Sequence, residues 1–370
     1  MLFILNCWKK VIQMSDAIAR SDGSFRIAML HVDLPSTSKG GVAWQVHYLS
    51  NAMVRRGHEV TVFGLDDPSA GALYEVRKIP VPEQIYRNRL LRLYLFSLFA
   101  ARQDYAGYHL IHAHGDNHFF FCRTIPLLRT FNGTSFNEAL TSTSLKRALI
   151  QLSLYPLEII SVMTSDRAIG ISRATNRYLP FVREVIPCGV DQALFYPGKK
   201  SERPSILFVG TLQGRKRGDF LVDIFNSRIR PALPQAELWM VCDEEVAGEG
   251  IKWYGRVSSQ VLAELYRSAW IFCLPSRYEG FGVPYIEAMA SGTPAVATAN
   301  PGAREVLGQR WGLISRDAEL GKTLINLLVN GAKREQLIRL GLKRASCFSW
   351  DRTAERYERI YAQMIKDKRY

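Results

Sequence analysis

The stretch from Ser276 to Pro294 restricts the possible fold more than any other part of the chain. The apolar run Ile271 to Leu274 comes directly before it and is typical of a fully buried strand. Gly280 and Gly282 then form a tight loop, and Pro284 suits the first turn of a helix, where its missing N–H would be unpaired anyway. The stretch therefore predicts a strand, a glycine-rich loop and a helix, which is where an open α/β sheet binds ligands. Free backbone N–H groups and the helix dipole favour an anion such as a phosphate there.

The same order of elements is expected at the amino end. Phe25 to Val32 reads as a strand, and a helix is expected from Val42 to about Arg56. The loop between them carries Gly40 and Gly41, and two adjacent glycines let the backbone approach a ligand closely. A plain tight turn is an equally good interpretation of this pair.

Two carboxylates bracket the central loop, namely Glu279 within it and Glu287 in the helix after it. They could be two surface glutamates, which is the common case for an isolated pair. A carboxylate beside an anion-binding loop repels phosphate, however, so it should serve another part of the ligand, for which hydroxyl groups are the natural partners. A phosphate flanked by polyols describes a nucleotide-sugar.

The segment from Glu279-Gly-Phe-Gly-Val-Pro to Glu287-Ala-Met-Ala-Ser-Gly-Thr-Pro resembles the donor site of retaining glycosyltransferases of family 4. The resemblance implies an α/β chain with the GT-B fold, in which two Rossmann-like domains face each other across a cleft. It implies that Glu279 contacts the donor sugar and that Glu287 contacts the ribose. The backbone of Phe281, Gly282 and Val283 would meet the sugar and the diphosphate. The same resemblance makes the loop with Gly40 and Gly41 face the donor phosphates.

The segment His109 to Asp116 ends a predicted strand and contains three histidines. Strand alternation puts His112 and His114 on one face. A metal site would need a third clustered ligand, which the segment lacks, so we expect no metal here. The resemblance implies that His114 is a polar residue of the catalytic cleft, near the transferred sugar and the acceptor. At the next strand end many family members have histidine, whereas this chain has Asn132, which cannot act as a general base.

A basic run, Arg215, Lys216 and Arg217, follows the predicted strand Ser205 to Gly210. It could be a solvated turn, but the family places a basic pair here against the donor diphosphate. Arg217 takes the usual lysine position by this count, and Thr211 stands where arginine is frequent, so Arg215 or Lys216 would have to supply the second contact. Each charge-assisted hydrogen bond contributes about 1.5–3 kcal/mol, and a helix end adds up to about 2 kcal/mol. Two basic side chains and a helix end could therefore replace a metal cation.

A length of 370 residues predicts two or three domains. With the resemblance, we expect an extension over residues 1–24, an acceptor-side Rossmann-like domain over 25–190 and a donor-side Rossmann-like domain over 191–349. Residues 350–370 would form an amphipathic helix that crosses back to the first domain. The segment ending at Val257 resembles the loop beside the nucleotide base.

The formal charge of +14 is spread along the chain and would suit nucleic acid, an anionic membrane or a phosphorylated substrate. Zinc-finger spacing, an aromatic RNA-binding signature and an arginine-rich tail are absent from the sequence, so we expect no nucleic-acid partner. Residues 84–103 and 146–155 combine basic and apolar side chains. They are either buried helices with basic exposed ends or helices that lie on an anionic membrane surface. Several family members act on lipid-linked acceptors, which favours peripheral membrane attachment through the amino-terminal domain.

Six cysteines are scattered without paired spacing, which indicates a reducing, cytoplasmic compartment. No apolar stretch reaches the ~18 residues of a spanning helix. In residues 1–14 the lysines follow the apolar part, which is the wrong order for a secretory signal, so this segment is a surface extension or translation begins at Met14.

These observations predict a retaining glycosyltransferase that moves a sugar from a UDP- or GDP-sugar to an acceptor hydroxyl, without a cofactor, in cell-surface polysaccharide or glycolipid synthesis. Two alternatives remain: a GT-B nucleotide-sugar epimerase, and a non-catalytic protein that has kept the donor pocket. An epimerase would need no separate acceptor, and a binding protein would show no turnover.

Overall fold

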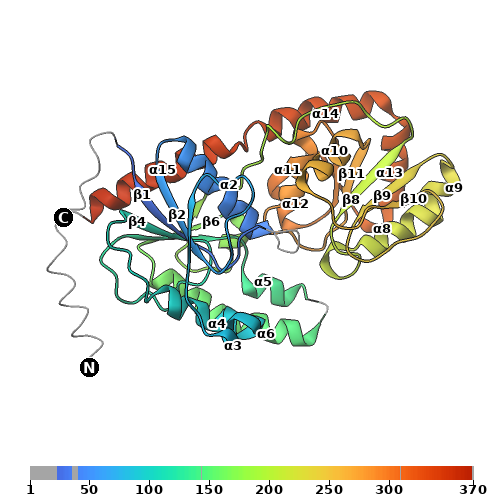
Figure 1. The fold of residues 1–370 in the computed structure, drawn as a ribbon. Helices are drawn as coiled ribbons and strands as arrows, with labels where there is room; N and C mark the ends of the chain where they lie inside the picture. Colours follow the sequence, from blue (N-terminus) through green and yellow to red (C-terminus); the bar gives the residue numbers. More distant parts are fainter. Residues whose placement is uncertain (1–22, 36–40, 143, 309, 369–370) are drawn as a thin grey trace. The chain divides into compact units, whose positions relative to one another are not determined.

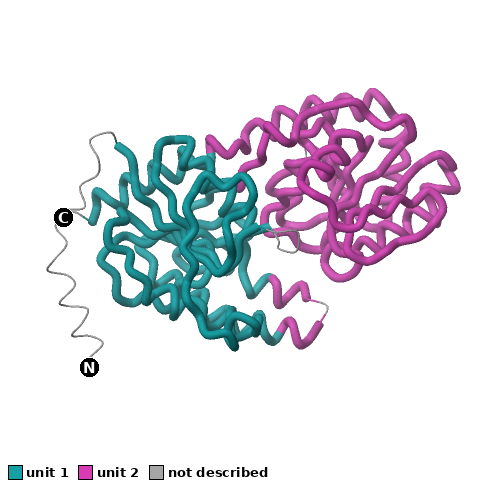
Figure 2. The backbone as a smooth tube through the Cα atoms, in the orientation of Figure 1, with its two compact units in different colours: residues 1–137, 149–186, 353–370 teal, residues 138–148, 187–352 magenta. Residues whose placement is uncertain are grey.

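The computed structural model describes residues 23–35, 41–142, 144–308 and 310–368. These residues divide into two compact units (Figure 2). Unit 1 takes the described residues within 1–137, 149–186 and 353–370, and unit 2 takes those within 138–148 and 187–352. Each unit is built around one parallel sheet with helices packed against it, so both are α/β (Figure 1).

The sheet of unit 1 has the order β3-β2-β1-β4-β5-β6-β7, and all neighbouring strands are parallel. Its strands are β1 (Arg26–Leu30), β2 (Glu59–Gly64), β3 (Glu75–Lys78), β4 (Leu110–Ala113), β5 (Leu127–Phe131), β6 (Arg167–Gly170) and β7 (Glu184–Val185). Helices cover the interior strands of such a sheet on both faces, which explains their short apolar runs, whereas the edge strand β3 is charged and mostly exposed. The strand order reverses at β1 and β4, so the carboxyl ends of these strands are where a ligand is expected.

The helices of the first half of the chain are α2 (Gly41–Arg55), α3 (Glu83–Arg87), α4 (Arg89–Ala100), α5 (Ser135–Leu140), α6 (Leu145–Met163) and α7 (Arg173–Asn176). The inward face of α2 carries Val46, Leu49 and Met53, all buried, at the spacing of an amphipathic helix. The Ser172 hydroxyl caps α7 by accepting a hydrogen bond from the backbone N–H of Thr175 at 3.0 Å.

The last helix, α15 (Trp350–Asp367), returns to the first unit, to which it belongs from Thr353 onward. Its inward face is rich in aromatic side chains, and Tyr357 and Tyr361 are almost fully buried. Both tyrosine hydroxyls form hydrogen bonds with side chains of β4 and β5. On the outside, Arg56 at the end of α2 pairs with Glu358 of this helix.

The sheet of unit 2 has the order β10-β9-β8-β11-β12-β13 and is also parallel throughout. Its strands are β8 (Ser205–Val209), β9 (Glu237–Val241), β10 (Ile251–Trp253), β11 (Ile271–Leu274), β12 (Ala295–Thr298) and β13 (Leu313–Ser315). The order reverses at β8 and β11. The loops after these two strands carry the basic run and the glycine-rich stretch identified in the sequence, so both lie at the edge where ligands bind.

The helices of unit 2 are α8 (Gly218–Ile224), α9 (Arg230–Ala232), α10 (Ser259–Ser268), α11 (Val283–Ala290), α12 (Pro301–Val306), α13 (Leu320–Val329) and α14 (Gly331–Ala345). Helix α11 is the central one, and Ile286, Ala288 and Met289 are at most 1% exposed. Helix α14 approaches it closely at Gly341, where an added Cβ would lie 3.1 Å from Met289 Cγ.

The chain passes from unit 1 to unit 2 between Ile186 and Pro187, close to the boundary expected near residue 190. Residues 138–148 group with unit 2, whereas the sequence analysis assigned them to the first domain. Most of the expected extension, residues 1–22, lies outside the described residues. Among those that are described, no helix combines the length and apolar character needed to cross a membrane.

Candidate active site

The glycine-rich loop of unit 2 has the predicted local structure. Strand β11 is fully buried, and α11 begins at Val283 with Pro284 in its first turn. Gly282 precedes the helix with φ at +98°, in the left-handed region that favours glycine. An added Cβ there would also lie 2.5 Å from Cδ2 of Tyr285, so the position requires glycine for two independent reasons.

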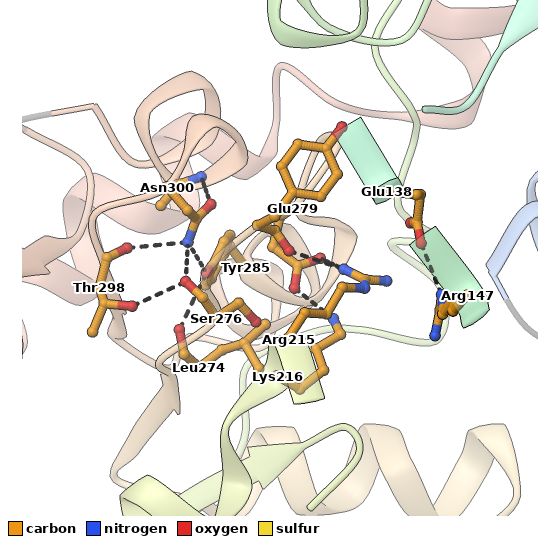
Figure 3. A network of polar contacts seen from close by, with 12 residues as sticks. Glu138, Arg147, Arg215, Lys216, Leu274, Ser276, Glu279, Tyr285, Thr298 and Asn300 are labelled. Atoms are coloured by element: carbon orange, nitrogen blue, oxygen red, sulfur yellow. Dashed lines mark hydrogen bonds and ion pairs between the residues drawn. The ribbon is translucent and has the colours of Figure 1, made fainter. Parts of the chain in front are cut away.

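Hydrogen bonds from neighbouring elements fix the start of this loop (Figure 3). The carbonyl oxygen of Ser276 accepts from Thr298 Oγ1 at 3.0 Å and from Asn300 Nδ2 at 3.1 Å. The Tyr285 hydroxyl donates to the carbonyl oxygen of Leu274 at 3.2 Å. These side chains come from α11, from the end of β12 and from the cap of α12, so three elements hold the loop in one conformation.

Glu279 lies in this loop and is 5% exposed. Its Oε1 atom lies 2.7 Å from Lys216 Nζ, and its Oε2 atom lies 3.5 Å from Nη1 of Arg215. Arg215 also donates to the carbonyl oxygen of Tyr278 at 2.9 Å. Burial alone would raise the pKa of Glu279, but Lys216 and Arg215 outweigh it, and the pKa lies below its usual value. The carboxylate is therefore ionised and held between two cations (Figure 3).

Glu287 lies one helical turn into α11 and is partly buried. Burial raises the pKa of this carboxyl to about 7, while the Tyr266 hydroxyl and Lys216 act in the opposite direction. Lys216 thus acts on both carboxylates that the sequence analysis singled out. Glu279 is therefore ionised at neutral pH, whereas Glu287 gains or loses its proton close to pH 7. Among the described residues, Lys216 and Arg215 form ion pairs with Glu279.

Arg217 lies outside this cluster, and its expected contact with the donor diphosphate stays a prediction. Its backbone is left-handed, with φ at 59°, where the short 3-10 turn Gly214–Lys216 ends and α8 begins. Its side chain pairs with Asp317 at 2.7 Å and stacks over the ring of Phe220. Lys216 occupies the position beside Glu279 instead, and Arg215 supplies the second cation.

The other residues predicted to bind the donor include Phe281, Val257, Gly40 and Gly41. Phe281 is buried, and its ring packs edge-on against that of Phe348. Val257 is partly buried in the loop before α10. Gly41 is the first residue of α2 in unit 1, and Gly40 lies outside the described residues.

In unit 1, His114 follows β4 at the carboxyl edge of the sheet and is 5% exposed. Its ring lies 4.1 Å from the ring of His112, centroid to centroid, which confirms that the two histidines share a face. Among the described residues neither ring nitrogen of His114 has a hydrogen-bond partner. Burial, followed by His112, His31 and Arg129, lowers the pKa of His114 well below its usual value, so the ring is neutral.

The sequence analysis did not single out Arg129 or Asp116, which lie at the same edge. Arg129 is 7% exposed in the interior strand β5, and its Nε and Nη1 atoms have no hydrogen-bond partner among the described residues. Burial raises the pKa of Asp116 to about 6, Arg129 opposes the rise, and Asp33 adds to it. A charged residue inside the apolar run Leu127–Phe131 was the signal available in the sequence. Among the described residues, no three His, Cys, Asp or Glu side chains gather closely enough to hold a metal ion.

Comparison with known proteins identifies the family and the fold of the chain. The chain matches the family model described as Glycosyltransferase Family 4 over residues 39–194 and the model described as Glycosyl transferases group 1 over residues 203–330. An uncharacterised glycosyltransferase of Methanocaldococcus jannaschii is 24% identical over 91% of this chain and 97% of its own length. Other curated relatives match over about half of their length.

Two solved structures share the fold. Sucrose-phosphate synthase from Thermosynechococcus elongatus superposes with a TM-score of 0.79 at 23% identity. The match covers 93% of this chain and 100% of the synthase chain. HepE from Anabaena, solved in complex with UDP-glucose, has a TM-score of 0.68 at 16% identity, covering 92% of this chain and 100% of that one. One family model matches in each α/β half, and the fold is that of GT-B enzymes. The chain is therefore a group 1 glycosyltransferase of the family 4 type.

Proposed function

We propose that this glycosyltransferase moves a sugar from a nucleoside-diphosphate sugar, a UDP- or GDP-sugar, to an acceptor hydroxyl with retention of anomeric configuration. The observation that carries the proposal is the contact of 2.7 Å between Lys216 Nζ and Glu279 Oε1, in a loop that opens a buried helix. An ammonium has three N–H donors, so Lys216 can hold Glu279 and still donate to a phosphate oxygen. A carboxylate for sugar hydroxyls and a cation for the diphosphate thus lie side by side.

Transfer of this kind needs charge stabilisation where the diphosphate leaves. Lys216 and Arg215 provide two cationic side chains, and the N-terminus of α11 adds a partial positive charge. Each charge-assisted hydrogen bond contributes about 1.5–3 kcal/mol. We propose that these groups stabilise the leaving diphosphate without a metal ion, while Glu279 orients the donor sugar and Glu287 binds the ribose.

Catalysis in this scheme is positioning and electrostatic stabilisation of an oxocarbenium-like transition state, and the leaving phosphate takes the proton of the acceptor hydroxyl. His114 is a neutral hydrogen-bonding group in unit 1, which suits contact with sugar hydroxyls better than with a phosphate. The complex of HepE with UDP-glucose supports a nucleotide-sugar donor for the fold.

The test is a panel of UDP-, GDP- and ADP-sugars scored by nucleotide release, with crude membrane lipids as acceptor and with EDTA present. We expect release that depends on the acceptor, survives EDTA and is lost in Lys216→Met. NMR of the product should give the anomeric configuration of the donor. Turnover without an acceptor would indicate an epimerase, and nucleotide binding with no turnover would indicate a binding protein. An inverted product would refute retention.

We further propose that the protein works at the cytoplasmic face of a membrane, in synthesis of a cell-surface polysaccharide or glycolipid. Helices α4 and α6 expose four leucines that are each at least 37% accessible, namely Leu90, Leu91, Leu149 and Leu152. Tyr94 on α4 contacts Ser153 on α6, so the two helices lie side by side in unit 1. Apolar side chains beside basic ones are typical of a surface that inserts among anionic lipids.

Arg87 and Arg89, both exposed, lie where α3 ends and α4 begins, and Arg87 also pairs with Glu83 at 2.6 Å. A basic side chain contributes about 1 kcal/mol near an anionic surface, and the pair with Glu83 reduces the share of Arg87. We expect sedimentation with anionic but not with neutral liposomes, and a weaker preference in the double variant Arg87→Ser, Arg89→Ser. Equal sedimentation with both kinds of vesicle would refute membrane attachment and leave the transfer reaction untouched.

A further inference from the structure

The C-terminal helix α15 forms a continuous chain of hydrogen bonds with the two strands that end at the candidate site of unit 1. The Tyr361 hydroxyl lies 2.6 Å from Nδ1 of His112 on β4. The other ring nitrogen, Nε2, lies 2.8 Å from Oγ1 of Thr130 on β5. The same Thr130 oxygen lies 3.0 Å from the hydroxyl of Tyr357, one helical turn before Tyr361. Both nitrogens of His112 are therefore occupied, and both ends of the chain lie on α15.

This chain fixes the ring of His112 in rotation. The hydroxyls on its two sides can each donate or accept, so either tautomer of the ring keeps both hydrogen bonds. A ring with a partner on each nitrogen cannot flip without losing two hydrogen bonds, and an unpaired buried polar atom costs more than a hydrogen bond contributes. The ring is 0% exposed, and Tyr357 packs against it with 4.9 Å between ring centroids. Burial, followed by Arg129, lowers the pKa of His112 to about 3, so the ring stays neutral.

His114 depends on this arrangement because it has no hydrogen bond of its own among the described residues. Its main aromatic neighbour is the His112 ring, at 4.1 Å between centroids and 39° between planes. The orientation of its two free nitrogens is therefore set by packing on His112. A shift of His112 would move them.

We propose that Tyr361, through His112, is a positioning residue that holds His114 in the orientation required for sugar transfer. The inference rests on the proposed function, in which His114 contacts a sugar. It gives α15 a role beyond packing, because the last helix of the chain then completes the site in unit 1.

The experiment compares Tyr361→Phe with Tyr74→Phe. Tyr74 is a matched control, because its hydroxyl also contacts a buried histidine, at 2.9 Å from His47 Nδ1 on α2. Both variants lose one tyrosine–histidine hydrogen bond, so both should lose some thermal stability. Only Tyr361→Phe should lower kcat, by about three- to tenfold, with the Kd for the nucleotide unchanged. A similar kcat in both variants would overturn the proposal.

Each substitution is also made in a His114→Gln background. We expect Tyr361→Phe to cause little further loss of kcat there, because the residue through which it acts is gone. An undiminished effect in that background would show that Tyr361 acts by another route and would refute the proposal.

An NMR measurement on the free protein tests the contact without any turnover. We expect the ring Cε1–H resonances of His112 and His114 to move in Tyr361→Phe and to stay in place in Tyr74→Phe. An unmoved His114 resonance would overturn the inference even in an active enzyme. Moved resonances in a protein without transferase activity would leave the positioning contact intact and refute the proposed function instead.

Discussion

Replacing Glu279 with glutamine removes one negative charge from a buried carboxylate and keeps its size. The wild-type side chain faces Lys216 at 2.7 Å and Arg215 at 3.5 Å. Removing one partner of a fully buried pair costs about 3–5 kcal/mol. The side chains of Lys216 and Arg215 are 16% and 32% exposed, so water partly compensates their charges. The glutamine oxygen can still accept from Lys216, and we expect a loss of about 1–2 kcal/mol in the free energy of unfolding.

The pH dependence of this loss has a definite sign. The pKa of Glu279 lies below its usual value, because Lys216 and Arg215 outweigh the effect of burial. Its stabilisation is therefore fully present above the unfolded-state pKa of 4.5 and disappears as the pH falls through the lower folded value. Urea unfolding should show a constant gap between wild type and Glu279→Gln above pH 5, which closes only in acid.

The substitution should cost more free energy in kcat/KM than in unfolding. If the ionised carboxylate binds a donor hydroxyl, its neutral replacement loses about 1.5–3 kcal/mol, or about 10- to 150-fold in kcat/KM. Glu237 provides a matched control, because it is also buried and lies 2.8 Å from Lys252 Nζ and 3.7 Å from Arg203. Glu237→Gln should lose stability and keep its activity. Equal activity in the two variants, measured by nucleotide release, would refute the role assigned to Glu279.

Two further predictions concern the same loop and helix. Burial raises the pKa of Glu287 from 4.5 to about 7, so its contribution to stability is present below pH 4.5 and is lost as the pH rises through 7. The free energy of unfolding of Glu287→Gln, measured in urea, should equal that of the wild type at pH 4.5 and exceed it at pH 8 by at most about 3 kcal/mol. A difference that does not change with pH would refute the raised pKa. Gly282→Ala should cost more stability than Gly57→Ala, because both have positive φ but only Gly282 also lacks room for a Cβ. We expect about 1–2 kcal/mol for Gly57→Ala and a clearly larger loss for Gly282→Ala, measured by urea unfolding, and equal losses would contradict the close contact with Tyr285.

The loop prediction succeeded because each of its signals is local. Gly282 and Pro284 restrict the backbone through their own covalent structure, and the apolar run before them has the length of a buried strand. These local signals did not predict that Glu279 is buried. Exposure is not a local property, and Glu279 is buried because Gly302 at the start of α12 packs against it, where an added Cβ would lie 2.7 Å from Glu279 Cβ.

The basic run shows where counting along the chain fails. Arg215, Lys216 and Arg217 are equivalent by charge and adjacent in sequence. The left-handed backbone at Arg217 turns its side chain toward Asp317, and Lys216 is left beside Glu279. Only the tertiary structure therefore shows which of the three basic side chains lie beside Glu279.

By itself, the sequence determined the strand, loop and helix between Phe25 and Arg56 and those between Ile271 and Pro294, including the loop that begins α11, because these follow from short-range periodicity and from glycine and proline. The tertiary structure decided which charged and polar side chains meet. Tyr361 and His112 are 249 positions apart, and Lys216 lies in a different loop from Glu279. Such contacts depend on how elements pack in space, and the local sequence pattern around a residue does not identify a partner that is distant in the chain.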